Sequence, residues 1–166
     1  MYPITYFADS QGFLSPQNQP FAPRNPDSQW DSLVLTTCTP PLPQFHDFDV
    51  LYQHTNEFRK HVFGLQNTRS VGNATDLYRD AKGRTRVVFG LQHAPRGLTF
   101  ERLRLLRRLG VVTMALAYNG ASEYGGGYET EFGLTEKGAD LVREMSRANI
   151  AVDLSHASHH LARDIL

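Results

Sequence analysis

The segment Asp153-Leu-Ser-His156 combines two residue types that carry acid–base chemistry. Asp153 interrupts an otherwise apolar run, residues 150–154, that is typical of a buried strand. A carboxylate in such a strand is costly unless it is hydrogen-bonded or paired. His156 follows just past the strand end, where parallel α/β folds place their active sites. The pattern therefore predicts a functional site here. The simpler interpretation is an Asp153 that binds loop backbone and a structural His156.

Three histidines, His156, His159 and His160, form an H-x-x-H-H pattern. Residues three or four positions apart share one face of a helix and can bind one metal ion together. We see no carboxylate placed to complete such a site. We therefore favour exposed histidines in the first turn of a helix over a metal site.

The elements that must position these residues alternate between apolar strands and amphipathic helices. Strands are predicted at residues 33–38, 87–91, 111–117 and 150–154. The predicted helices begin at the capping residues Thr99, Thr135 and Ser158. Strands this apolar, alternating with helices, are typical of a parallel α/β sheet. No GxGxxG sequence follows any of these strands, so a dinucleotide-binding fold has no support.

A triple glycine, Gly125-Gly126-Gly127, lies between the third and fourth predicted strands. It lacks the Lys-Ser/Thr pair that follows in a phosphate-binding loop. We therefore expect a flexible loop that lies over the strand ends.

Composition excludes several functional classes. The 166 residues contain 17 Lys and Arg and 17 Asp and Glu, so the formal net charge is zero. Binding to nucleic acid or to an anionic membrane, which needs excess positive charge, is not expected. The only cysteine, Cys38, allows no disulfide framework. The sequence shows no apolar stretch of about 18 residues and no signal-peptide pattern, which favours the cytoplasm.

Two parts of the chain differ in composition. Residues 1–31 are rich in Pro, Gln, Asn and Ser, and we expect an irregular N-terminal segment there. Residues 32–166 hold all the predicted strands and form the expected α/β domain. The chain is short for a complete (β/α)₈ barrel, which typically needs about 250 residues. We therefore expect a partial barrel that is incomplete at its C-terminal end.

Residues 84–166 resemble the first half of the membrane (renal) dipeptidase family, the zinc dipeptidases. The resemblance lies in the segments LRRLGVVTMALAYN, GLTEKGADLVREMSR and IAVDLSHAS, which follow one another in this order. It implies a partial (β/α)₈ TIM-type barrel of about the first four strands. It also implies the family's activity, hydrolysis of dipeptides by a zinc-activated water, and a pair of zinc ions bridged by a carboxylate. Two neighbouring dications need anionic ligands to offset their repulsion.

The sequence departs from the family pattern at the metal ligands. Thr37 and Thr39 occupy the positions of the family's His-x-Asp pair, and Gln92 occupies that of the bridging glutamate. The family's other two metal histidines would fall beyond Leu166. His156 matches the family's histidine that contacts the substrate carbonyl without binding metal. An alternative register of the first strand would recruit His46, Asp47 or Asp49 as ligands.

These departures lead to two competing hypotheses. In the first, the chain belongs to a family of peptide hydrolases but is catalytically impaired and binds no zinc. In the second, it is a non-catalytic module for peptide-like ligands or for protein interaction, or a truncated gene fragment. In either case the unpaired edges of a partial barrel predict self-association, or coverage of an edge by the N-terminal segment.

Overall fold

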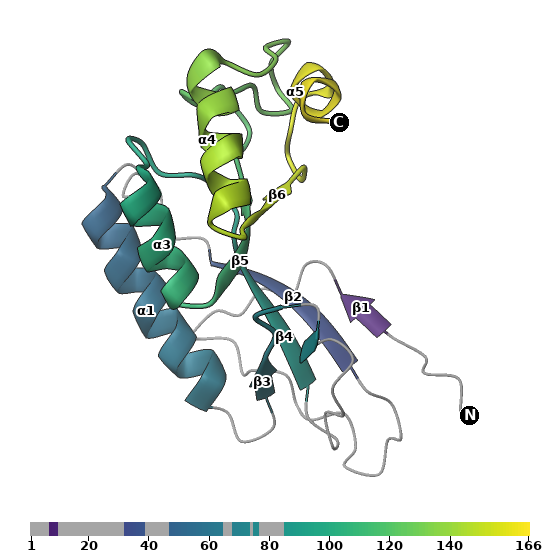
Figure 1. Cartoon of the computed structure of the whole chain (residues 1–166). Helices are drawn as coiled ribbons and strands as arrows, with labels where there is room; N and C mark the ends of the chain where they lie inside the picture. The colour runs from purple at the N-terminus through teal and green to yellow at the C-terminus, as the bar shows by residue number, and fades with distance from the viewer. Residues whose placement is uncertain (1–6, 10–31, 39–46, 65–67, 74, 77–84) are drawn as a thin grey trace.

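The fold is a parallel α/β sheet with helices packed against it (Figure 1). The computed structural model describes residues 7–9, 32–38, 47–64, 68–73, 75–76 and 85–166. The strands are β1 (Phe7–Asp9), β2 (Ser32–Cys38), β3 (Thr68–Ser70), β4 (Thr85–Leu91), β5 (Val111–Ala115) and β6 (Ala151–Asp153). Their order in the sheet is β1-β2-β4-β5-β6, and every pairing is parallel.

Strand β4 is the centre of this sheet. It pairs with β2 along one edge, from Arg86 to Leu91. Its other edge pairs with β3 near the start of the strand and with β5 from Phe89 onward. The parallel register brings the carboxyl ends of β2, β4, β5 and β6 to the same edge of the sheet.

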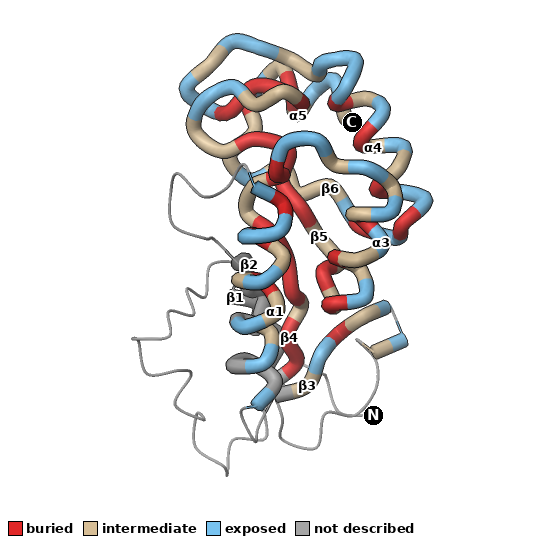
Figure 2. Tube along the Cα trace, turned by 90° about the vertical axis from the view of Figure 1, so that its left-hand side faces the viewer, coloured by how far each residue is buried: buried red, intermediate tan, exposed pale blue. Residues whose placement is uncertain are grey.

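The core forms where the alternating apolar residues of β4 meet the helices. Val87, Phe89 and Leu91 are fully buried, in one cluster with Leu103 and Leu106. Figure 2 shows this buried stripe running through β4 and β5, while the outer helices alternate between buried and exposed residues. Burial of these side chains is the main favourable contribution to folding.

Each predicted helix begins at the capping residue that the sequence indicates. The helices are α1 (Phe48–Gly64), α3 (Phe100–Arg108), α4 (Glu136–Arg147) and α5 (His159–Ile165). The hydroxyl groups of Thr99, Thr135 and Ser158 accept hydrogen bonds from backbone N–H groups in the first turns of α3, α4 and α5. The carboxylate of Asp47 does the same for α1, accepting from Asp49 N at 2.8 Å. These side chains satisfy N–H groups that the first turn leaves unpaired.

The structure confirms the predicted fold class and adds two short strands. Neither β1 nor β3 was predicted, because three residues are too few to show a periodicity. Strand β1 falls within the segment expected to be irregular and pairs with β2 at the end of the sheet. Residues 7–9 of the N-terminal segment thus pair with the edge of β2, which agrees with the expectation that this segment covers a sheet edge. None of the helices that the structure describes is long and apolar enough to cross a membrane.

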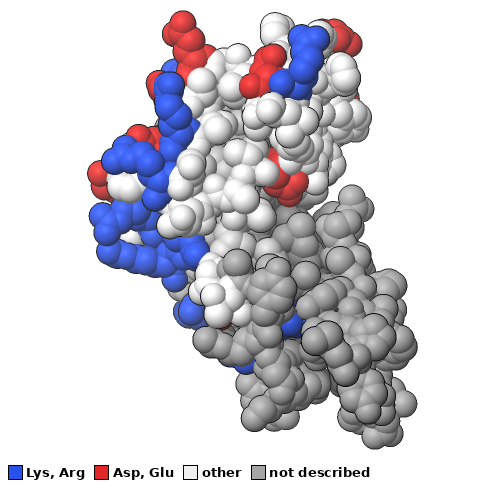
Figure 3. Space-filling view, turned by 45° about the vertical axis from the view of Figure 1, so that its right-hand side comes forward, with Lys and Arg blue, Asp and Glu red and all other residues white. Residues whose placement is uncertain are grey.

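Basic side chains gather along the flank of the molecule where α3 lies (Figure 3). This helix carries Arg102, Arg104, Arg107 and Arg108. Arg102 lies over the ring of Phe48, and Arg107 donates to the backbone oxygen of Gly72. Two of the four arginines therefore fasten α3 to neighbouring elements.

Candidate functional site

The ends of β4 and β6 bring Gln92 and His156 into direct contact. Gln92 follows β4 at once, and His156 lies three positions after the last residue of β6. Gln92 Nε2 is 3.1 Å from His156 Nε2, and both side chains are partly buried. An amide nitrogen can only donate, so the imidazole Nε2 accepts and its proton lies on Nδ1. The centre of the site is therefore an amide–imidazole pair.

The segment after β6 holds His156 in an unusual backbone conformation. His156 has a φ of 63°, in the left-handed region that non-glycine residues rarely adopt. Asp153 Oδ1 accepts from Ser155 N at 2.8 Å, and Ser158 N donates to Gly126 O at 2.9 Å. The Ser158 hydroxyl also donates to Phe132 O. These bonds hold the strained residue in place, and such strain clusters at functional sites.

This geometry decides between the interpretations of Asp153. Its carboxylate binds the backbone of the turn that carries His156, as the simpler interpretation predicted. Asp153 therefore helps to fix the turn that carries His156.

Two tyrosine rings lie beside His156. The ring centroids of Tyr118 and His156 are 4.3 Å apart, and those of Tyr128 and His156 are 6.0 Å apart. Sequence reasoning missed both residues. Tyr118 comes directly after the predicted strand 111–117, and its position at a strand end was the signal that could have identified it.

The glycine-rich loop is tied down, contrary to the expectation of a flexible loop. Gly125, Gly126 and Gly127 are buried, and Gly127 forms an antiparallel bridge with Ala157. Gly127 N donates to Gly120 O at 3.0 Å. A Cβ atom at Gly127 would lie 2.0 Å from Tyr118 O, so only glycine fits this close approach.

A second set of bonds joins this loop to the segment between β4 and α3. The buried Tyr124 hydroxyl donates to Pro95 O and accepts from Leu98 N, each at 3.0 Å. Burial raises the pKa of Tyr124 to about 12. Glu123 accepts from Gly97 N at 2.6 Å, and this hydrogen bond lowers the pKa of Glu123.

The described residues at the strand ends do not fit a pair of zinc ions. Gln92 supplies an uncharged amide, and its nitrogen is bonded to His156. Thr37 is part of β2, where it pairs with Gly90, and Thr39 lies outside the residues that the structure describes. Within the described ranges, no group of three His, Cys, Asp or Glu side chains could hold a metal ion.

The described residues of the two alternative metal-ligand sets, the histidine cluster and the residues just before α1, take part in other interactions. His160 Nε2 lies 3.2 Å from Glu131 Oε2, at the surface. Asp47 caps α1 and Asp49 lies in its exposed first turn, while His46 is outside the described residues. The expectation of exposed histidines in a first helical turn holds for His159, and His160 beside it is partly exposed; it is wrong for His156, which lies before α5, is partly buried and contacts Gln92.

Comparison with known proteins gives one family and several similar folds. The family model described as membrane dipeptidase (Peptidase family M19) matches residues 30–166. An amidohydrolase from Pseudomonas aeruginosa has a similar structure, with a TM-score of 0.67 at 20% identity, and the match covers 81% of this chain and 41% of that one. A metallo peptidase from Rhodobacter sphaeroides, liganded with a phosphinate mimic of the dipeptide L-Ala-D-Ala, gives a TM-score of 0.63 at 17% identity. This match covers 81% of this chain and 48% of that one. The probable dipeptidase PvdM from Pseudomonas aeruginosa gives a TM-score of 0.64 at 18% identity, and the match covers 81% of this chain and 39% of that one.

These matches confirm the predicted partial barrel. The structural matches cover less than half of each similar protein, and the parallel sheet corresponds to part of their TIM-barrel-like fold.

Proposed function

Because the chain belongs to the membrane dipeptidase family, we propose that it binds a dipeptide or similar small molecule beside His156 and does not hydrolyse it. The observation that carries the proposal is the Gln92–His156 contact. It joins the position of an expected metal ligand to the one expected substrate contact that the chain retains.

Binding rests on the chemistry of the neutral imidazole. With Nε2 engaged by Gln92, His156 has its Nδ1–H as the donor for a ligand carbonyl or carboxylate. The left-handed backbone at His156 is fixed before any ligand arrives, so little ordering is needed on binding. The Tyr118 ring beside it limits the orientations that the imidazole can take.

Absence of hydrolysis follows from the charge of the groups at the end of β4. The family chemistry requires a water whose pKa a metal ion has lowered. An amide at Gln92 carries no charge to offset that of two metal ions, and a threonine hydroxyl is a poor zinc ligand. Zinc is therefore a cofactor of the family that we do not expect this chain to bind.

The test combines titration calorimetry with a hydrolysis assay on the purified chain. Ala-Ala should bind in the presence of EDTA, and His156→Ala should weaken binding at least about tenfold, as for loss of a well-placed polar contact. His159→Ala is the matched control, since this exposed histidine lies three positions further along and should leave affinity unchanged. With zinc added, no turnover is expected.

Two outcomes contradict the proposal in different ways. Zinc-dependent turnover that chelation and His156→Ala both abolish would show that the chain is an active dipeptidase. If no dipeptide binds, the proposed ligand site beside His156 is wrong.

A second candidate function, protein association, rests on the edge of the sheet. Among the described strands, β6 pairs with β5 alone, so its outer edge has unpaired backbone groups. We propose that this edge mediates self-association. Sedimentation should reveal a concentration-dependent oligomer, and a monomer at all concentrations would contradict it.

A further inference from the structure

We propose that Tyr128 determines ligand specificity at this site by forming an aromatic wall that selects peptide-like ligands with an apolar or aromatic side chain. The inference rests on the proposed function, because it concerns the same ligand beside His156.

The first observation is the exposure of a large ring next to a candidate binding group. Tyr128 is 56% exposed, yet its ring centroid lies 6.0 Å from that of His156. Tyr118, the other tyrosine beside the imidazole, is only partly exposed. Its ring centroid lies closer to that of His156, at 4.3 Å. The Tyr128 ring thus has surface left for a ligand held by the histidine, and apolar surface gains free energy when it is covered.

The second observation is that the backbone on both sides of Tyr128 is fixed. Gly127 N donates to Gly120 O, and Glu129 N donates to Asn119 O, each at 3.0 Å. Gly127 is also bridged to Ala157, the residue directly after His156. The loop therefore holds Tyr128 in a set position relative to the imidazole. Such preorganisation lowers the entropic cost of binding.

The third observation concerns charge. A hydrogen bond to Glu129 is the main cause that raises the pKa of Tyr128, so the hydroxyl stays protonated and neutral. The carboxylate of Glu129 disfavours a negatively charged ligand side chain near this ring. The wall therefore disfavours acidic side chains.

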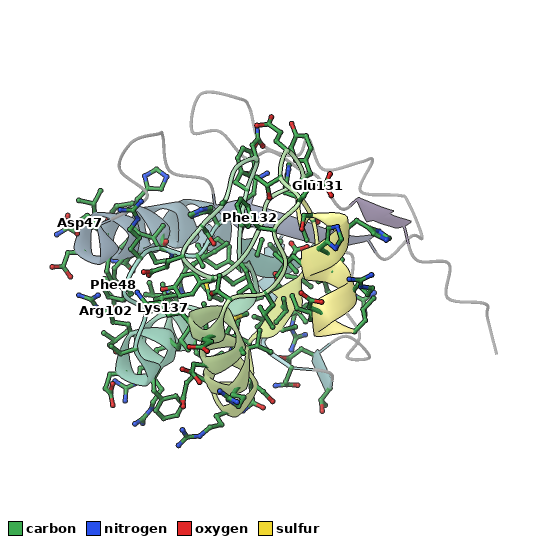
Figure 4. The ribbon with its side chains drawn as sticks, turned by 90° about the horizontal axis from the view of Figure 1, so that it is seen from above. Asp47, Phe48, Arg102, Glu131, Phe132 and Lys137 are labelled. Carbon is green, nitrogen blue, oxygen red and sulfur yellow. The ribbon has the colours of Figure 1, made fainter. Side chains whose placement is uncertain are left out.

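An exposed phenylalanine on the same loop gives a matched control. Phe132 is 66% exposed, and Figure 4 shows it together with Glu131 on the loop that lies over α5. None of the ring contacts found among the described residues joins Phe132 to His156. If exposure alone mattered, Phe132 and Tyr128 would affect binding equally.

The experiment measures the affinity of Gly-Gly, Gly-Phe and Phe-Gly for the chain by calorimetry in EDTA. The wild type should bind one of the two phenylalanine dipeptides about three- to tenfold more tightly than Gly-Gly, the range expected for one aromatic contact. Tyr128→Ala should bring this ratio close to one. Tyr128→Phe and Phe132→Ala should both preserve it.

The outcomes separate this inference from the proposed function. Equal affinity of the wild type for all three dipeptides, or a ratio that Tyr128→Ala leaves unchanged, overturns the role of Tyr128 while the binding site stands. Absence of binding by every dipeptide overturns both proposals.

Discussion

The two sides of the candidate site differ in how their functional groups are held. At the end of β6, His156 is fixed by a turn, a glycine-rich loop and two tyrosine rings. At the end of β4, Gln92 offers one neutral amide. In the proposed function the β6 side recognises the ligand, while the amide on the β4 side does not supply the charge that metal activation requires. Recognition and activation depend on different strand ends, so one can exist without the other.

The largest expected effect comes from breaking the recognition side at Gly127. In Gly127→Ala the new Cβ would lie 2.0 Å from Tyr118 O and 2.4 Å from Asn119 O, both backbone atoms. The loop must move to relieve this clash, so we expect a loss of about 3 kcal/mol in the free energy of unfolding and loss of dipeptide binding. Urea denaturation and calorimetry measure the two effects.

Gly120→Ala serves as the control for this change. Its Cβ would meet nothing within 4 Å, so the same substitution on the same loop should leave stability and binding nearly unchanged. Equal effects of the two variants would contradict the close approach at Gly127.

The next effect concerns the bonds that join the loop to the segment after β4. Tyr124→Phe removes a buried hydroxyl that donates to Pro95 O and accepts from Leu98 N. Leaving these buried groups unpaired should cost about 1–2 kcal/mol. Because the folded state favours the neutral tyrosine, its contribution is complete below pH 10 and is lost as the pH rises from about 10 to about 12.

Thermal unfolding across alkaline pH measures this effect. The wild type should lose stability more steeply than Tyr124→Phe in that range. Parallel curves for the two proteins would show that Tyr124 titrates alike in both states.

Local signals explain why much of the fold could be predicted from the sequence. Thr99, Thr135 and Ser158 each cap a helix by accepting a hydrogen bond from the backbone N–H three positions further along. A short stretch of sequence is therefore enough to predict where each helix begins. The four main strands were found because each lies in a run rich in apolar and β-branched residues. Strands β1 and β3 have three residues each and form only because β2 and β4 lie beside them.

The site was harder to predict because its contacts join distant residues. His156 was identified from its position past a strand end and Gln92 through the family resemblance, but their bond spans 64 positions. The contact of Tyr128 with His156 depends on how Gly127 docks against Ala157, which no local pattern shows. The prediction that Thr39 replaces a metal ligand remains a prediction.

A smaller effect is expected at Glu123, which also fastens the loop. Its pKa is lowered mainly by the bond from Gly97 N, so the ionised form stabilises the folded state. This contribution is present above the unfolded pKa of about 4.3 and is lost as the pH falls through the lower folded value. Glu123→Gln should therefore cost about 1 kcal/mol or less at pH 7.

The acid arm of the unfolding profile is the measurement for Glu123. Glu123→Gln should flatten it, because the substitution removes the carboxylate that accepts from Gly97 N. An acid arm that Glu123→Gln leaves unchanged would contradict this role of Glu123.

The smallest effect is expected from restoring a carboxylate to the β4 side. Gln92→Glu places an oxygen where the amide nitrogen faces His156 Nε2. The imidazole can move its proton to Nε2 and keep the contact, so stability should change by less than about 1 kcal/mol. One carboxylate does not complete a metal centre where no three ligand side chains converge in the part that the structure describes. Zinc content by atomic emission and dipeptide turnover should therefore match those of the wild type. A gain of bound zinc with turnover would show that the β4 side lacks only this one carboxylate, and the contrast between the two strand ends would reduce to a single residue.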